Sequence, residues 1–372
     1  MSVLCACLML FLVGQIANAD NATVWVGMGA PQQGEKEGIY RTILDEETGV
    51  LEPPQLVAEI GEPEFLTLRS DGRRLYAACR LPNGDGGVAA FEIGSDGKSL
   101  QLMNTQPLGG GRACHVAIDP TTRCLYSAQY GDGTVAVFPL AEDGSIEARS
   151  ALVEHKGSGP DASRQETPHP HSVNPSPNDS FLLVPDLGTD RVEIYRTDPA
   201  TGTLESYGHG NSPPGGGPRH MTFSSNSEFA YVVNEMGLSV TVFKYDSKAG
   251  SLEPIQTIPT IPEDLRTPGN NCSEIRMHPS GQFLYTGNRV HDSITAFRVD
   301  PQSGRLTFIE VEAAHGKHPR NFNVDPSGKW LLVAGRDSNS ISVFKIDQDS
   351  GELDYTGQSV SSPAPICIVF QP

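Results

Sequence analysis

A pattern of about 50 residues recurs along the chain and limits what it can fold into. Each copy has an alternating segment, a short turn and a second apolar segment, as in PRNFNVDPSGKWLLVAGR from Pro319. A third alternating segment follows, such as NSISVFKI, and then a D-x-x-(S/T)-G-x-L hairpin, such as DQDSGELDYT. Alternation in short runs bounded by turn residues is typical of β-strands. The sequence therefore predicts repeated units of four strands. Complete copies begin near Pro63, Ala113, Pro170, Pro218, Ser273 and Pro319.

The two ends of the chain supply the strands of one more unit. The C-terminal APICIVFQP matches the first strand of the pattern, and the segment from ATVWVGMGA to VLEPP matches the other three. Pairing the ends would close a ring and remove the bare edges of an open array. A pair of β-sandwiches would not explain this complementarity, and a WD40 propeller is disfavoured because no Trp-Asp pair occurs. We predict an all-β, seven-bladed β-propeller with four antiparallel strands per blade, formed by residues 20–372 as a single domain.

Residues 1–19 predict an export signal. An apolar run at residues 3–13 leads to Ala17-Asn18-Ala19, which fits the small-x-small cleavage pattern. The run is shorter than the roughly 20 residues that a membrane span needs. No Lys or Arg precedes it, which departs from the usual signal pattern. We expect a periplasmic or extracellular protein if the signal functions, and a cytoplasmic one otherwise.

Net charge limits the classes of binding partner, and the cysteine pattern limits the disulfide and metal chemistry of the chain. The formal net charge of −18 disfavours nucleic acid and anionic membranes as partners, and we expect a monomer. The cysteines after residue 19 are odd in number, widely spaced and without a C-x-x-C pair, so neither a disulfide framework nor a zinc site is indicated. We expect small buried core residues at Cys79, Cys114, Cys124, Cys272 and Cys367.

The predicted topology gathers polar residues on one face. The first strand of a blade is innermost and the second runs antiparallel to it, so first-strand starts and second-strand ends meet at the mouth of the central channel. The first group comprises His115, His169, His171, Arg219, His220, Glu274, Arg276, His318 and Arg320. The second comprises Arg80, Gln129, Asp186, Asn234, Glu235, Asn288, Arg289, Arg336 and Asp337. Such a mouth favours a small anionic ligand, because Arg binds carboxylate and phosphate bidentately. The alternative is that these groups pair with one another and hold the blades together.

No cofactor or metal motif is present. The chain lacks the P-loop, the H-E-x-x-H pair, the G-x-S-x-G elbow and a sound G-x-G-x-x-G. His169 and His171 stand at i and i+2, and in an extended strand they face opposite ways, which disfavours joint metal ligation. We expect neither a metal nor an organic cofactor.

At these positions the chain resembles the seven-bladed lactonase propellers, which include bacterial 6-phosphogluconolactonases and carboxymuconate-lactonizing enzymes. The most specific motifs are G-P-R-H at residues 217–220, V-N-E at residues 233–235 and H-P-R-N-F-N-V-D-P-S-G-K from His318. The resemblance covers the chain beyond residue 19. It implies catalytic roles for His171, Arg219, Glu235 and Arg289. We expect substrate contacts from His169, His220, Asn234, Asn288 and Arg320 at the same mouth.

The resemblance implies hydrolysis of a sugar-acid lactone, as in 6-phosphogluconolactonases. Either Glu235 or His171 would be the base and the other the proton donor to the leaving hydroxyl, while Arg219 and Arg289 would hold the substrate's anionic group and stabilise the oxyanion. The same groups could run the lactonizing direction, and a non-catalytic secreted propeller that binds an anionic small ligand is a third reading. The export signal departs from the family's mostly cytoplasmic sugar-phosphate enzymes.

Overall fold

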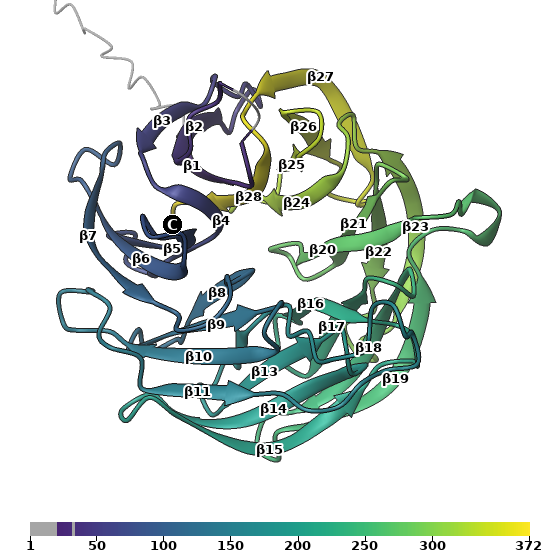
Figure 1. The fold of residues 1–372 in the computed structure, drawn as a ribbon. Coiled ribbons are helices and arrows are strands. Elements are labelled where there is room, and N and C mark those ends of the chain that lie inside the picture. The colour runs from purple at the N-terminus through teal and green to yellow at the C-terminus, as the bar shows by residue number, and fades with distance from the viewer. Residues whose placement is uncertain (1–20, 32–33) are drawn as a thin grey trace, which may run out of the picture.

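Seven four-stranded antiparallel sheets are arranged around a central axis (Figure 1). The computed structural model describes residues 21–31 and 34–372, so the predicted signal at residues 1–19 lies outside the described residues. The architecture confirms the predicted all-β, seven-bladed propeller. In the part of the chain that the structure describes, no helix is long and apolar enough to cross a membrane.

Each blade contributes one strand to each of four concentric layers. The innermost strands are β28 (Pro365–Phe370), β4 (Gly61–Leu68), β8 (His115–Ile118), β12 (Asn174–Pro175), β16 (Pro218–Phe223), β20 (Asn271–Met277) and β24 (Pro319–Val324). The second strands are β1 (Asn21–Met28), β5 (Arg74–Arg80), β9 (Cys124–Gln129), β13 (Phe181–Asp186), β17 (Phe229–Asn234), β21 (Phe283–Arg289) and β25 (Trp330–Gly335).

The outer two layers complete the sheets. The third strands are β2 (Ile39–Asp45), β6 (Gly86–Ile93), β10 (Thr134–Pro139), β14 (Arg191–Asp198), β18 (Ser239–Asp246), β22 (Ser293–Val299) and β26 (Ser340–Ile346). The outermost strands are β3 (Gln55–Ala58), β7 (Leu100–Pro107), β11 (Ala151–Glu154), β15 (Thr203–Asn211), β19 (Ser251–Pro259), β23 (Leu306–Ala313) and β27 (Leu353–Ser361). A short 3-10 helix, η1 (Glu263–Leu265), lies in the loop between β19 and β20.

The ring closes by pairing the two ends of the chain, as predicted. The C-terminal strand β28 is innermost in the sheet of β1, β2 and β3, and Val26 of β1 pairs with Ile368 of β28. In Figure 1 the yellow β28 lies beside the purple β1. No blade therefore leaves a bare inner edge at the closure.

One inner strand is shorter than its sequence pattern predicts. Only Asn174–Pro175 pair with the next strand as β12. Pro170 forms an isolated bridge to Asp186, and the ladder is interrupted between Pro170 and Asn174. The backbone N–H of His171 still donates to the carbonyl of Pro185 at 2.9 Å. His171 therefore remains at the channel end of the blade, where the pattern predicts it.

The hydrophobic core lies mainly between neighbouring blades. One cluster joins Phe283 and Tyr285 of β21 to Phe322 of β24 and Val333 of β25. Cysteines contribute to these layers. Four of the five described cysteines are buried as predicted, whereas Cys114 is half-buried, and none of the five is in a disulfide.

The glycine of the recurring hairpin packs against an aromatic ring of the neighbouring blade. Gly304 has φ +68°, and a Cβ built there would lie 2.3 Å from Cδ1 of Phe229. Gly351 stands in the same relation to Phe283. The D-x-x-(S/T)-G motif therefore both turns the chain in the left-handed region and fits one blade against the next.

We expect Gly304→Ala to lower the free energy of unfolding by about 2 to 4 kcal/mol, because a left-handed Ala is strained and its Cβ overlaps Phe229. Gly357→Ala is the matched control, since Gly357 has φ +79° but nothing within 4 Å of its Cβ position. Denaturant unfolding of both variants measures the difference. Equal destabilisation would show that backbone strain alone matters and that contact between blades does not.

Candidate functional site

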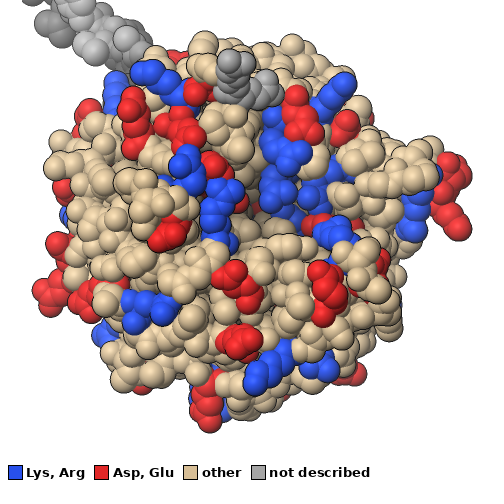
Figure 2. Space-filling model, in the orientation of Figure 1, with Lys and Arg blue, Asp and Glu red and all other residues tan. Residues whose placement is uncertain are grey.

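Basic side chains gather at the mouth of the central channel. Seen along the axis, Lys and Arg lie around the central depression of the disc, although the whole chain is acidic (Figure 2). Starts of inner strands and ends of second strands meet there, because each such pair of strands is antiparallel.

The carboxylate of Glu235 is the centre of this group. It follows β17 and is only 4% exposed. Arg219 Nε lies 3.1 Å from Glu235 Oε2, and Arg289 Nη2 lies 2.7 Å from the same oxygen. Arg164 Nη2 lies 2.8 Å from the other oxygen, Oε1. Three guanidinium groups from three separate segments therefore surround one buried carboxylate.

The two buried arginines are also held by backbone carbonyls. Arg219, on β16 and 2% exposed, donates through Nη1 to Ser273 O at 2.6 Å. Arg289, at the end of β21, donates through Nη2 to Cys272 O at 2.7 Å. The Arg219 contact crosses from one blade to the next, whereas Arg289 and Cys272 belong to the same blade. Both guanidinium groups are thereby fixed beside Glu235. Their charges are positioned before any ligand arrives.

Burial and neighbouring charge compete over the ionisation of this cluster. Burial alone would raise the pKa of Glu235, but Arg289 and Arg219 outweigh it and hold that pKa well below its usual range. Burial, with Arg289 and Arg320 nearby, lowers the pKa of Arg219 to about 9, against the opposing effect of Glu235. The stable state at neutral pH is an ionised carboxylate among protonated arginines.

Three imidazole rings lie next to the carboxylate cluster. The ring centroid of His220 is 5.2 Å from that of His171 and 5.2 Å from that of His115. Burial, followed by the charge of Arg219, lowers the pKa of His171 well below 6.5. Nδ1 of His171 has no hydrogen-bond partner among the described residues. His171 is therefore neutral at neutral pH and able to accept a proton.

His220 differs from His171 because a carboxylate fixes its ring. Its Nδ1 lies 3.0 Å from Glu274 Oε1, and Asn321 donates to the other oxygen of Glu274. Nε2 of His220 is buried without a partner in the part of the chain that the structure describes. Burial is also the largest cause of a pKa well below 6.5 for His220. The Glu274 contact orients the imidazole beside Arg219.

The four residues predicted to be catalytic thus lie in one cluster with His220, and Arg320 is close to it. Arg320, at the start of β24, lines a small channel cavity with Glu64, Arg219 and His220. His169 lies beside the cluster, but its ring stacks on Tyr130 at 4.4 Å and its Nδ1 bonds to Tyr130 O. The substrate contact predicted for His169 stays a prediction, and the structure shows its ring fixed against Tyr130.

Asn234 and Asn288, for which we predict substrate contacts, bond within their own blades. Asn234 Nδ2 donates to the hydroxyls of Ser239 and Thr241, and Asn288 Nδ2 donates in the same way to Ser293 and Thr295. Both asparagines are fully buried. Side chains alternate along a strand, so each asparagine faces into its own blade while the next residue, Glu235 or Arg289, faces the channel. Their amide nitrogens therefore fix strand ends, whereas Oδ1 of Asn234 has no hydrogen-bond partner among the described residues.

Sequence reasoning missed Arg164 and Tyr130. Tyr130 follows β9 at the repeat position that Glu235 and Arg289 occupy in their blades, so the repeat itself contained the signal. Its ring lies 5.3 Å from that of His171. Arg164 belongs to the loop between β11 and β12, where strand periodicity says nothing.

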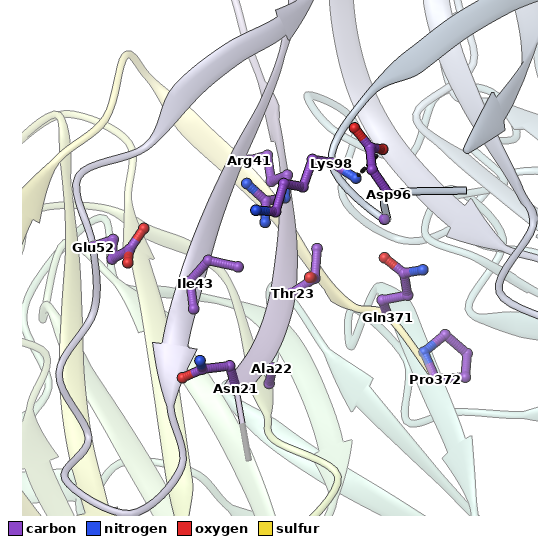
Figure 3. Close-up of a pocket in the computed structure, with 11 residues that line it drawn as sticks. Asn21, Ala22, Thr23, Arg41, Ile43, Glu52, Asp96, Lys98, Gln371 and Pro372 are labelled. Carbon is purple, nitrogen blue, oxygen red and sulfur yellow. Dashed lines mark hydrogen bonds between the residues drawn. The ribbon is translucent and has the colours of Figure 1, made fainter. Parts of the chain in front are cut away.

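A different pocket lies on the opposite face of the disc, where β1 begins and the chain ends. Arg41, Asp96, Lys98 and Gln371 are among its lining residues (Figure 3). It contains neither histidine nor cysteine, so it offers no proton acceptor suited to neutral pH. Among residues 21–31 and 34–372, no group of three His, Cys, Asp or Glu side chains could hold a metal ion. We therefore place the candidate site at the channel mouth.

The fold and the site together define a class of protein: seven-bladed propellers whose channel mouth carries an Arg-bound glutamate and histidines. Residues 23–370 match the family model described as Lactonase, 7-bladed beta-propeller, and the chain belongs to that family.

Relatives and solved structures agree with this assignment. The chain is 36% identical over 301 residues to a 6-phosphogluconolactonase of Bacillus subtilis, covering 81% of this chain and 85% of that protein. A 6-phosphogluconolactonase of Formosa agariphila is 32% identical over 279 residues, covering 73% of this chain and 78% of that protein. The structure of a periplasmic gluconolactonase from Pseudomonas aeruginosa superimposes with a TM-score of 0.89 at 30% identity, covering 95% and 99% of the two chains.

Proposed function

We propose that this protein hydrolyses a sugar-acid lactone at the channel mouth. The observation that carries the proposal is the Glu235 carboxylate bound by Arg219 and Arg289 beside the neutral His171, whose Nδ1 has no hydrogen-bond partner in the described part of the chain. Relatives named 6-phosphogluconolactonase and gluconolactonase support a lactone as substrate. The relative named periplasmic also supports export, which we propose together with the signal at residues 1–19.

Lactone opening needs a base, an oxyanion stabiliser and a proton for the leaving oxygen. His171 takes a proton from water as the water oxygen attacks the lactone carbonyl carbon. Arg219 and Arg289 stabilise the resulting oxyanion. Collapse of the tetrahedral intermediate breaks the ring C–O bond, and the imidazolium of His171 returns its proton to the leaving alkoxide. The products are a carboxylate, a free hydroxyl and one released proton.

Glu235 suits a positioning role better than the role of base. Two arginines share its Oε2 and Arg164 binds its Oε1, so both oxygens already accept hydrogen bonds. The pKa of Glu235 and the pKa of His171 are both lowered, so the choice between them rests on access: Nδ1 of His171 has no hydrogen-bond partner among the described residues. Glu235 balances the charge of the arginines and aims their N–H groups, while His171 moves the proton.

Hydrolysis of 6-phosphogluconolactone and of gluconolactone by the chain without residues 1–19 tests the proposal. The spontaneous opening of each lactone is measured separately and subtracted. Turnover above that background is expected with at least one of them. Its absence with both would contradict the proposal and favour the lactonizing or ligand-binding readings.

The pH dependence of kcat/KM should follow His171. Because burial and Arg219 lower the pKa of His171 well below 6.5, the base stays neutral from pH 6.5 upward, and kcat/KM should be flat between pH 6.5 and the pKa of Arg219, about 9, above which the oxyanion donor loses its charge. On the acid side, activity should fall only as pH drops through the lowered pKa of His171, where His171 gains a proton. Initial rates at constant ionic strength measure the profile. A midpoint at 6.5 or above would contradict the assignment of His171 as base.

A further inference from the structure

The arginines near Glu235 fall into two groups. Arg219 and Arg289 are buried, and both are bound to Glu235 and to backbone carbonyls. Arg164 and Arg320 have most of their donors free. A guanidinium group carries five N–H donors in a planar fork, so a free fork at the mouth of a channel is available to a planar or tetrahedral anion.

Arg164 lies at the entrance to the site. Its side chain is 41% exposed. Only Nη2 has partners, Glu235 Oε1 at 2.8 Å and the hydroxyl of Tyr130 at 3.4 Å. Its Nε and Nη1 have no hydrogen-bond partner in the described part of the chain. Arg164 therefore contacts the buried carboxylate with one end of its fork and leaves the other end open.

The loop that bears Arg164 is built to hold it in place. Asp161 accepts hydrogen bonds from the backbone N–H groups of Ser163 and Arg164. Gln165, which is fully buried, donates to Leu187 O at 2.8 Å and to Asp190 Oδ1 at 2.7 Å. Both flanks of Arg164 are thus anchored, so the ordering cost of presenting its guanidinium is met before a ligand binds.

Arg320 lies on the other side of the cluster. Among residues 21–31 and 34–372 its side chain makes no hydrogen bond and no ion pair within 4.0 Å, although the residue is half-buried. Burial and the charge of Arg289 lower its pKa, and the charges of Glu64 and Glu235 oppose this. An anion bound beside Arg320 would relieve the electrostatic cost of this cation.

Other cations of the mouth are already paired. Carboxylates bind four more arginines within the described residues. The pairs are Arg80 with Glu37 and Glu62, Arg112 with Glu62 and Glu64, Arg276 with Glu274, and Arg336 with Asp337. Among the described residues, Nε of Arg276 and Nε of Arg289 also lack a partner, but both atoms are buried. Accessible guanidinium donors are therefore found at Arg164 and Arg320, on the sides of the Glu235 cluster.

We propose that Arg164 and Arg320 bind an anionic substituent of the substrate, a phosphate or a carboxylate, while Arg219 and Arg289 stay with Glu235 and the oxyanion. The inference rests on the proposed lactonase function and narrows its substrate to an anionic sugar lactone. It moves the binding of the anionic group from Arg219 and Arg289, where the sequence placed it, to a pair with free donors.

The test compares three lactones: 6-phosphogluconolactone, a glucarolactone with a free carboxylate, and neutral gluconolactone. We expect Arg164→Ala and Arg320→Ala each to lower kcat/KM for the preferred anionic lactone about 10- to 100-fold, mainly through KM, because each removes charge-assisted hydrogen bonds. With gluconolactone the loss should stay within about threefold. Arg164→Lys should recover part of the selectivity. Arg266→Ala, which removes an exposed arginine bound to Ile261 O, is the control for the loss of one positive charge. It should leave kcat/KM unchanged for both the anionic and the neutral lactone.

The outcomes separate the inference from the proposed function. A wild-type preference for either anionic lactone supports the inference and identifies the substituent. An equal loss with charged and neutral lactones would show that Arg164 only positions Glu235, and it would overturn the inference. A wild-type preference for gluconolactone would also overturn it while leaving the lactonase function intact. A protein that opens none of the three lactones would contradict the function itself, and the inference with it.

Discussion

Glu235→Gln is expected to lower kcat for lactone hydrolysis by about 100-fold or more. The amide has nearly the shape of the carboxylate, but its NH2 group would face a guanidinium donor. Arg219, Arg289 and Arg164 would lose the charge that holds them in place. Breaking a buried pair on one side also costs about 3 to 5 kcal/mol of stability, so a lower melting temperature should accompany the loss.

A control variant and a pH profile test the prediction for Glu235→Gln. The matched control is Glu37→Gln, which makes the same change in an Arg-bound carboxylate at the rim, where Glu37 pairs with Arg80. The control should keep wild-type turnover. The second measurement is the pH profile of the residual activity of Glu235→Gln. If the residual activity still falls as pH drops through the lowered pKa of His171, His171 is confirmed as the base. If that fall is absent, the role of base moves to Glu235. A folded Glu235→Gln protein with full turnover would refute the site.

The fold was predictable because its information is local and repeated. Alternating strands and the D-x-x-(S/T)-G hairpins are short-range signals, and the complementary ends required a closed ring. From the closed ring it follows that His171, Arg219, Glu235 and Arg289 meet, although 118 residues separate the first from the last. Topology alone brought these residues together.

The details of the site depend on side-chain direction along the strands and on loop shape. Side-chain direction could be predicted from the sequence: alternation along a strand means that Asn234 and Glu235 cannot both face the channel, and in the structure the asparagine faces into the blade. Loop shape could not be predicted. Arg164 reaches Glu235 only because the turn at Asp161 and the buried Gln165 shape its loop, and no periodic pattern encodes that shape.

The other large effect is expected from Arg219→Ala, which should lower kcat by about 100- to 1,000-fold, the usual cost of removing an oxyanion donor. Arg219 is deeply buried, and burial lowers its pKa to about 9, so its charge depends on Glu235. Removing it leaves Glu235 with less compensation and Ser273 O without its donor. Arg219→Lys should keep the charge but lose the planar fork that donates to Glu235 through Nε and to Ser273 O through Nη1, and it should recover only part of the rate.

A double-mutant cycle distinguishes a shared role from two independent ones. If Arg219 acts on the reaction only while Glu235 aims it, Arg219→Ala combined with Glu235→Ala should lose little more activity than either single variant. Arg196→Ala is the control for loss of a positive charge, since Arg196 lies over the ring of Tyr207 on the outer surface. Additive losses in the cycle would show that the two residues contribute separately, and they would return an independent catalytic role to Glu235. A near-wild-type rate in a folded Arg219→Ala protein would remove the oxyanion role from this arginine.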